Sequence, residues 1–332
     1  MIDSVLISPY TDIFYQSFYY LGLRRLFGQH SIRFTTKPFQ AVKRSSTFAF
    51  ILPIHNGTRK IIIDSADSSK FDDTALDWCD VYGKVNFLED EFPASYKQKI
   101  LPIGPSFGVR IWSLPMTVGV AVRNYLLVRN ELKDTRNFLA NYWRQYKYRV
   151  GEEDLRQIPS KDNYVFFTSS IWKREPETNI YRKNFIESCR QIPNLEFEGG
   201  FIPRKKNDVQ GFENFYHFKR YSHSEYIRKT QQSLASFNTP AVMKCHGWKL
   251  GEYLALGKAI ISTMITREMP GEFEAGKHYL LTDGSVEDMK SILVTLKSNA
   301  SYRQQLEKSA RDYYCNYLAP QVVVQRLIRH TA

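Results

Sequence analysis

The second half of the chain alternates between strand-like and helix-like segments, and this alternation constrains the fold more than any other feature. Strands are predicted over 163–168, 194–202, 233–238, 259–262 and 279–281, and helices over 179–191, 222–232, 249–256 and 286–298. Such alternation is typical of β–α–β units, in which helices cover a parallel sheet. Ligands of such sheets bind at the carboxyl ends of the strands, so we expect a site in the loops after Thr168, Asn238 and Ser262.

The first half is less regular but also mixes strands and helices. Predicted here are strands at 4–8, 47–54 and 60–64, a helix over 12–27, a turn at Asn56-Gly57 and one long basic helix over 120–148. A final helical segment covers 301–329, and the polar stretch 151–161 is the expected linker. A chain of 332 residues is long enough for two domains. We place them at 1–155 and 156–332, in an α/β protein.

Charge is the second informative property of the sequence. Lysine and arginine number 46 against 34 acidic residues, for a net charge of +12. The excess is spread over both halves, unlike the basic block of a typical nucleic-acid binder. It is densest over 101–150, where the only acidic residues are Glu131 and Asp134. A phosphate-rich substrate or an anionic membrane surface would suit such a face, although a solvated helix explains any one of these charges equally well.

Cysteine spacing and hydropathy indicate the compartment. The four cysteines lie far apart and show no zinc-ligand spacing, which favours a reducing cytoplasm over a disulfide framework. The longest nearly uncharged apolar stretch, 111–122, is shorter than the roughly 18 residues that a membrane span needs. The first residues lack the basic start of a signal peptide. We therefore expect a cytoplasmic protein, which could also lie peripherally at the inner face of the cell membrane.

The segment from 236 to 262 carries the most chemical information. A strand ends at Asn238, a polar loop reaches His246-Gly247, and a helix opens with Lys249 in its first turn and Glu252 three residues later. The free N–H groups and positive end of a helix dipole favour an anion, and a lysine adds a charge. A nucleotide diphosphate fits this pattern, with its phosphates at the helix end and its ribose hydroxyls on the glutamate.

This segment resembles the C-terminal domain of GT-B glycosyltransferases of the group 1 type, which use nucleotide-activated sugars. The resemblance is carried by one ordered set of residues: Gly247, Trp248, Lys249, Glu252, Ala255, Gly257 and Ile260-Ile261. Met269-Pro270-Gly271 resembles a later loop of the same domain. Thr168-Ser169-Ser170 followed by Trp172-Lys173-Arg174 resembles the loop whose basic residue usually meets the donor diphosphate.

The resemblance implies a fold and a reaction. It implies two Rossmann-like domains with a central cleft, an acceptor-binding domain followed by a nucleotide-sugar-binding domain with a terminal helix. The implied donor-binding residues are Lys173, Arg174, His246, Gly247, Trp248, Lys249 and Glu252. The implied reaction needs no metal and no cofactor, because the nucleotide sugar is itself a substrate. The acceptor would be a saccharide or a lipid-linked saccharide, in bacterial surface polysaccharide synthesis.

The sequence departs from the family pattern at one position. Many retaining members carry a second glutamate eight residues before the first, and Lys244 stands there in this chain. The departure leaves a retaining or an inverting outcome open. It also keeps open a catalytically inactive relative of the family.

The acceptor side rests on fewer signals. An inverting enzyme needs a base that deprotonates the attacking hydroxyl, and Asp67, in a loop crowded with carboxylates, is our candidate. Asp12 competes for that role and, with Tyr15, is a candidate acceptor contact; Tyr15 belongs to an aromatic set that a helix core would also explain. A nucleic-acid binder is the alternative from another class, since Asn141–Arg149 interleaves basic and aromatic residues.

Overall fold

The computed structural model describes residues 4–55, 57–204 and 208–330, and the chain divides into two compact units. The first unit contains Met1–Glu152, Glu268–Pro270 and Asn316–Ala332, and the second contains Glu153–Arg267 and Gly271–Cys315. The expected second domain, 156–332, ran to the C-terminus. In the structure the last segment belongs to the first unit instead.

The first unit is built on a mixed six-stranded sheet. In chain order its elements are β1 (Val5–Ile7), α1 (Ile13–Phe27), β2 (Ile32–Phe34), β3 (Thr47–Ile54), β4 (Gly57–Asp64), α2 (Asp73–Trp78), β5 (Val81–Lys84), β6 (Ile100–Pro102), α3 (Leu114–Val128), α4 (Thr135–Lys147) and α10 (Pro320–Arg329). The strand order is β2-β1-β3-β4-β5-β6, and β3 runs antiparallel to both of its neighbours. The unit is therefore α/β, but its sheet is not the wholly parallel one that a Rossmann-like domain implies.

The hairpin of β3 and β4 explains that antiparallel strand. Ile54 pairs with Gly57, so the connection is too short for the crossover that parallel strands need. The predicted turn residue Asn56 lies outside the described residues. The register buries Ile61, Ile62 and Ile63 on β4, at the centre of the sheet.

The long helix predicted over 120–148 is wrong, because the structure forms two helices there. Helix α3 ends at Val128, and α4 begins after Asp134, whose side chain accepts a hydrogen bond from the backbone N–H of Asn137 at 2.9 Å. An aspartate that caps a helix satisfies N–H groups with no partner inside the helix, so it favours a new start over a continuous helix.

The second unit contains the predicted parallel strands and their helices. Its elements are β7 (Tyr164–Ser170), α5 (Pro176–Arg190), β8 (Glu196–Ile202), α6 (His223–Gln232), β9 (Ser236–Asn238), α7 (Trp248–Leu256), β10 (Ile260–Ser262), β11 (Leu280–Leu281), α8 (Val286–Ser298) and α9 (Ala300–Tyr313). All the strand pairs are parallel, in the orders β7-β8 and β11-β10-β9. Strands β7 and β9 are neighbours, since the N–H of Leu234, just before β9, donates to the carbonyl of Tyr164 at 2.6 Å.

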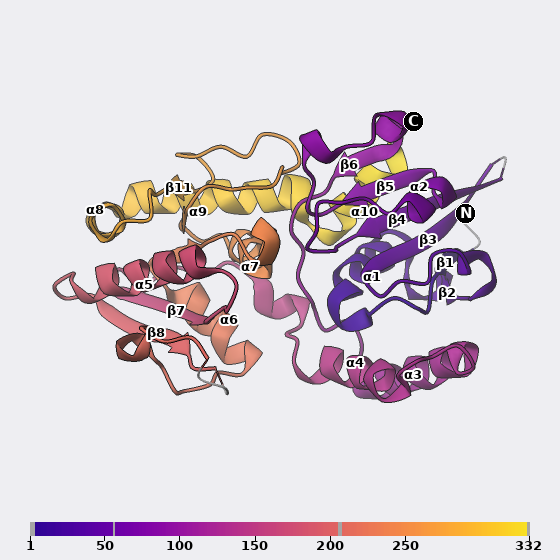
Figure 1. Cartoon of the computed structure of the whole chain (residues 1–332), viewed down its shortest axis with the longest axis horizontal. Coiled ribbons are helices and arrows are strands. Elements are labelled where there is room, and N and C mark those ends of the chain that lie inside the picture. Colours follow the sequence, from indigo (N-terminus) through magenta and orange to yellow (C-terminus); the bar gives the residue numbers. More distant parts are fainter. Residues whose placement is uncertain (1–3, 56, 205–207, 331–332) are drawn as a thin grey trace. The chain divides into compact units, whose positions relative to one another are not determined.

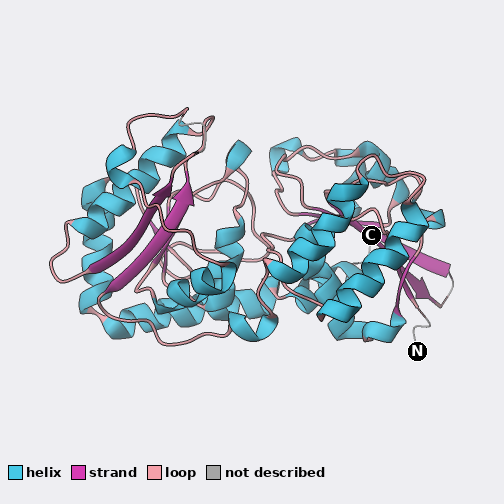
Figure 2. Ribbon diagram, turned by 90° about the horizontal axis from the view of Figure 1, so that it is seen from below, coloured by secondary structure: helices cyan, strands magenta, loops and turns pink. Residues whose placement is uncertain are grey.

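Helices pack against the strands in each unit, as Figure 2 shows in cyan and magenta. In the second unit a core of buried apolar side chains joins the strands to α5 and α8, with Phe185 stacked on Phe237 at a centroid distance of 4.5 Å. The α/β class is thus confirmed. No helix in the described ranges is long and apolar enough to cross a membrane.

The C-terminal helix α10 belongs to the first unit because of two close approaches. It follows α9 through a short π-helical turn, Tyr314–Leu318, and lies among the strands and helices of the first unit (Figure 1). Its buried face packs on α1 and β5. Gly22 of α1 meets the backbone of Pro320, and Gly83 of β5 meets Leu327; at each glycine, a β-carbon would come within 3.0 Å of these partners.

Replacing Gly22 by alanine therefore tests the packing of α10 on α1. The new methyl group would lie 2.3 Å from the carbonyl oxygen of Pro320, which belongs to backbone and cannot rotate away. We expect Gly22→Ala to lower the free energy of unfolding of the first unit by about 1–3 kcal/mol. Urea unfolding followed by tryptophan fluorescence measures this change.

Gly119→Ala is the matched control. Gly119 also lies inside a helix, but no atom stands within 4 Å of the added methyl group. Alanine there should raise the free energy of unfolding by up to about 1 kcal/mol, because glycine is a poor helix former. Equal stabilities for Gly22→Ala and wild type would contradict the packing of α10 on α1.

Candidate functional site

The candidate site lies in the second unit, where α7 begins. Strand β9 ends at the buried Asn238, a loop follows, and Gly247 precedes the first residue of α7, Trp248. A β-carbon on Gly247 would touch only the side chain of Ala241, at 3.7 Å, so the neighbours do not require glycine here. Gly247 instead keeps the space in front of the first N–H groups of α7 free of a side chain. Helix α7 ends at Gly257, which adopts the left-handed conformation with φ of 60°.

Lys249, in the first turn of α7, points toward the end of β7. Its ammonium group donates to the carbonyl oxygen of Thr168 and lies 4.9 Å from the ring centroid of Phe167. Burial, and to a lesser degree the charge of Arg182, lower the pKa of Lys249 to about 7, while the carboxylate of Glu252 opposes this shift. The predicted lysine thus contacts the carboxyl-terminal part of β7, the first strand of the unit.

Arg182, on α5, is a second cation near this site; it is buried, and the sequence analysis missed it. Its Nε donates to the hydroxyl of Thr239 and its Nη1 donates to the carbonyl of Ser170, both at 3.2 Å. The guanidinium lies 4.9 Å from the ring centroid of Trp172. Burial lowers the pKa of Arg182 to about 10. The residue sits in the middle of an amphipathic helix, and no spacing motif marks it.

Neither the buried Arg182 nor the partly buried Lys249 forms an ion pair with a carboxylate in the part of the chain that the structure describes. The oxygens that Arg182 and Lys249 contact belong to backbone carbonyls and one hydroxyl. A buried charge without a counter-ion costs free energy, and an anion bound from solution would remove that cost. The two cations therefore mark a candidate anion site at the carboxyl ends of β7 and β9.

Glu252 is buried one turn further along α7 and has a partner. Nε2 of His223, the first residue of α6, lies 3.0 Å from its Oε1. The other ring nitrogen of His223 is buried without a hydrogen-bond partner among the described residues. The sequence analysis missed His223 as well, although the pattern Ser222-x-x-Glu225 is a capping box that fixes the start of α6.

The loop before α7 holds two residues in an unusual backbone conformation. Met243 and Lys244 have φ values of 56° and 58°, in the left-handed region that side chains disfavour. Their carbonyls accept hydrogen bonds from Arg267 and Thr266, at 2.6 Å each. Lys244, where retaining relatives carry a glutamate, is exposed. Such strain costs on the order of 1–3 kcal/mol per residue and is typical of binding sites.

The other predicted donor contacts differ in burial. His246 is buried, Trp248 is partly buried, and Lys173 and Arg174 are exposed on the loop after β7. Lys173 lies 3.7 Å from a carboxylate oxygen of Asp208. To contact a donor diphosphate as predicted, the exposed side chains of Lys173 and Arg174 would have to move toward it.

The predicted acceptor residues lie in the first unit. Asp67 is exposed, three residues beyond the end of β4. Asp12 caps α1: one carboxylate oxygen accepts from the N–H of Phe14 at 3.0 Å and the other from Asn141 at 2.8 Å. Burial raises the pKa of Asp12, and the hydrogen bonds to it oppose this. Tyr15 is 49% exposed, whereas Phe18 of the same helix is core.

A buried ion pair that the sequence analysis did not predict also lies in the first unit. Lys84, with no exposed side-chain surface, donates to Asp64 at 2.6 Å, and the hydroxyl of Tyr82 donates to the same oxygen at 2.6 Å. The carbonyl of Lys70 also accepts from Lys84, at 2.9 Å. Because these groups satisfy one another, the pair fixes the carboxyl ends of β4 and β5 and occupies the carboxylate of Asp64.

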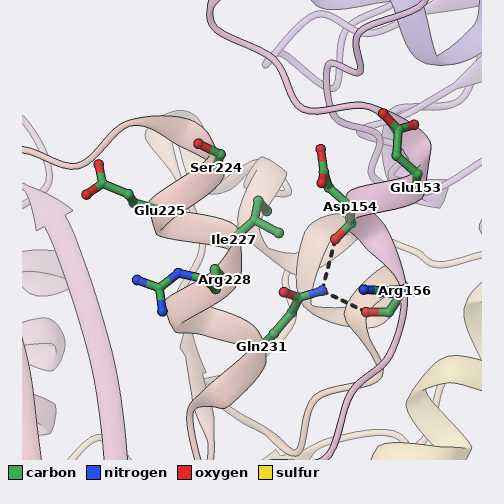
Figure 3. Close-up of a pocket in the computed structure, with 8 residues that line it drawn as sticks. All are labelled: Glu153, Asp154, Arg156, Ser224, Glu225, Ile227, Arg228 and Gln231. Carbon is green, nitrogen blue, oxygen red and sulfur yellow. Dashed lines mark hydrogen bonds between the residues drawn. The ribbon is translucent and has the colours of Figure 1, made fainter.

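A pocket of about 350 Å³ opens elsewhere on the second unit (Figure 3). It is lined by the segment 153–156 and by one side of α6, and none of the candidate donor contacts lines it. Gln231 closes one side by donating to the carbonyls of Asp154 and Arg156, at 2.9 and 2.8 Å. Side chains of both charge signs line this pocket, so its lining does not favour an anion. Among the described residues, no cluster of three or more His, Cys, Asp or Glu could hold a metal ion.

Comparison with known proteins gives matches among solved structures alone: no family model and no curated protein matches the sequence. This chain is similar to the C-terminal domain of a glycosyl transferase group 1 family protein from Francisella tularensis. The match covers 48% of this chain and 87% of that domain, with 17% sequence identity and a TM-score of 0.32. The match to a glycosyltransferase from Rickettsia africae covers 76% of this chain and 64% of the other chain, with 12% sequence identity and a TM-score of 0.42.

A third match is the UDP-GlcNAc 2-epimerase from Neisseria meningitidis, over 77% of this chain and 63% of its own, with 12% identity and a TM-score of 0.40. GT-B glycosyltransferases, the class that the sequence resembles, are thus among the structural neighbours. At these identities the similarity concerns the fold and says nothing about a substrate of this chain.

The lowered pKa of Lys249 gives a prediction for stability. At pH 9 the unfolded chain keeps the proton on this lysine, whose ordinary pKa is 10.5, whereas the folded chain has released it. The unfolded state binds more protons, so stability rises with pH above about 7. Relative to Lys249→Met, the wild type should gain about 1–3 kcal/mol in free energy of unfolding from pH 6 to pH 9.

Chemical denaturation of both proteins at the two pH values measures this difference. Burial also lowers the pKa of Lys258, to about 8, but that residue is present in both proteins and its contribution cancels. Parallel pH profiles for wild type and Lys249→Met would show that the ammonium group of Lys249 is well solvated.

Proposed function

We propose that this chain is a glycosyltransferase that binds a nucleotide sugar in its second unit. The observation that carries the proposal is a pair of cations at the carboxyl ends of β7 and β9, the buried Arg182 and the partly buried Lys249, neither of which has a carboxylate partner in the described ranges. The positive end of the helix dipole of α7 lies at the same place. A diphosphate supplies the negative charge that this arrangement lacks.

Each end of the donor has a proposed partner. The diphosphate binds at the N-terminus of α7, with Gly247 leaving room for it and Arg182 and Lys249 supplying charge. The ribose hydroxyls donate to Glu252, which His223 orients from α6. His246, Trp248, Lys173 and Arg174 remain proposed contacts of the donor.

The chemistry of transfer follows from these charges. The acceptor hydroxyl attacks the anomeric carbon, the bond from that carbon to the diphosphate oxygen breaks, and negative charge builds on the leaving diphosphate. Cations already in place stabilise that charge, so the step requires no metal. Asp67 is the proposed base that takes the proton of the hydroxyl, and Tyr15 and Asp12 are the proposed acceptor contacts, of which Tyr15 is the exposed one.

The wider setting follows from the sequence resemblance. We propose a saccharide or lipid-linked saccharide as acceptor, a cytoplasmic location and a role in bacterial surface polysaccharide synthesis. No nucleic acid is expected as a partner. Within the segment 141–149, Asn141, Tyr142 and Gln145 are buried in the first unit, which reduces the surface available for stacking bases.

Thermal stabilisation by nucleotides tests the donor site. A nucleoside diphosphate or nucleotide sugar at a hundred times its dissociation constant should stabilise the protein by about 2.7 kcal/mol, with or without a chelator. Glu252→Gln should weaken that binding roughly 10- to 100-fold, because it removes charge-assisted hydrogen bonds from the ribose. Glu287→Gln, an exposed glutamate of α8 in the same unit, is the matched control and should bind as wild type does.

The same titration separates the alternatives. Binding of the nucleotide without transfer to any acceptor would favour an inactive relative, to which the lysine at position 244 also points. Absence of any shift with the whole panel of nucleotides would overturn the donor site. Salt-dependent retention on single-stranded DNA would favour the nucleic-acid alternative.

His223 gives a second prediction for the same assay. His223→Leu removes the group that holds Glu252 and should weaken nucleotide binding about three- to tenfold. His223→Gln keeps a donor at the position of Nε2 and should restore most of the affinity. If both variants bind equally well, or if both merely lose thermal stability without nucleotide, His223 does not position Glu252.

A further inference from the structure

Helix α3 of the first unit presents its apolar residues to solvent and its polar residues to the protein. The buried residues of α3 are Thr117, Ala121, Asn124 and Val128, which form one stripe along the helix. Asn124, at its centre, donates to the hydroxyl of Tyr142 of α4 at 2.9 Å. The stripe that packs on α4 is thus half polar, which is the reverse of an ordinary amphipathic helix.

The solvent side of α3 is almost wholly apolar. Val118, Val122 and Leu126 follow one another at intervals of four residues, so they form a line along the helix. Each of the three side chains is at least half exposed. Leu114, Met116 and Leu127 flank this line and are also exposed. We call these six residues the α3 face.

Helix α4 continues the exposed apolar surface with a tryptophan. Trp143 is 49% exposed, and Leu139 is exposed one turn before it. Arg136 and Lys147 share this side of α4 by their spacing, and both are exposed. Figure 1 shows α3 and α4 side by side in the first unit. Tryptophan beside basic residues is typical of side chains that lie at a membrane–water interface.

The charges around the α3 face have one sign. Arg123 on α3, and Arg129 and Lys133 on the following turn, are exposed. The two acidic residues of this region are occupied: Glu131 accepts from Lys43 and Tyr10, and Asp134 caps α4. The surface that surrounds the apolar line is therefore basic.

We infer that the α3 face docks on an anionic lipid membrane. Apolar side chains that lie in the headgroup region and a surrounding set of lysines and arginines are what interfacial binding requires. A second copy of the chain fits less well. A symmetric dimer through this face would place Arg123 and Arg129 close to the same charges of the partner. The inference depends on the first unit alone and stands or falls independently of the donor site.

Vesicle sedimentation with the full chain tests the docking. The probes are phosphatidylcholine vesicles and vesicles in which about a third of the lipid is phosphatidylglycerol. We expect the wild type to sediment with the anionic vesicles and to stay in the supernatant with the neutral ones. Val122→Glu and Leu126→Glu should each weaken binding about tenfold or more, because each would place a carboxylate in the lipid interface.

Val294→Glu is the matched control, since Val294 is similarly exposed on helix α8 of the second unit. It should bind as the wild type does, and all three variants should keep the unfolding temperature of the wild type, because the substituted side chains are exposed. Arg123→Glu combined with Arg129→Glu should weaken binding about tenfold, and added salt should do the same.

Three results would overturn the inference. One is a wild type that sediments with neither kind of vesicle. Another is equal loss of binding in Val294→Glu, which would assign the effect to general charge. The third is a dimer in sedimentation velocity that Val122→Glu dissociates, together with no vesicle binding, which would assign the α3 face to a second copy.

Discussion

The placement of the buried Arg182 and the partly buried Lys249 at the carboxyl ends of β7 and β9 is the constraint on which the second unit depends. Both groups carry charge into a region of low polarity, and both are held by carbonyl and hydroxyl oxygens in place of carboxylates. Such an arrangement makes the unliganded protein less stable than an apolar core would. An anion bound there, as we propose, would offset that cost and would link stability to binding at the same atoms.

Hydrogen bonds also hold the residues around these cations in place. The strained pair Met243 and Lys244 is held by hydrogen bonds from 266 and 267, which keeps the loop before α7 in place. Glu252 is held by His223, which contacts its Oε1. The first unit shows the opposite arrangement, since its buried Lys84 is neutralised by Asp64 and serves structure alone.

Much of the site could be predicted because it is local in sequence. The order of Gly247, Lys249 and Glu252 lies within two turns of one helix, so spacing alone fixes their relation. Arg182 and His223 could not be found in this way, because α5 and α6 bring them to the site from positions about 65 and 30 residues away. The break between α3 and α4 was missed for a different reason: one capping side chain, Asp134, outweighed a continuous amphipathic pattern.

The sequence by itself determined the α/β class, the strand–helix alternation of the second unit and the order of Gly247, Lys249 and Glu252 at α7, because periodicity, turns and helix starts depend on neighbouring residues. Only the tertiary structure decided that α10 packs in the first unit, where Gly22 and Gly83 leave room for it. It also decided which side of α3 faces solvent. These outcomes depend on contacts between segments far apart in the chain, and no local pattern specifies which surfaces will meet.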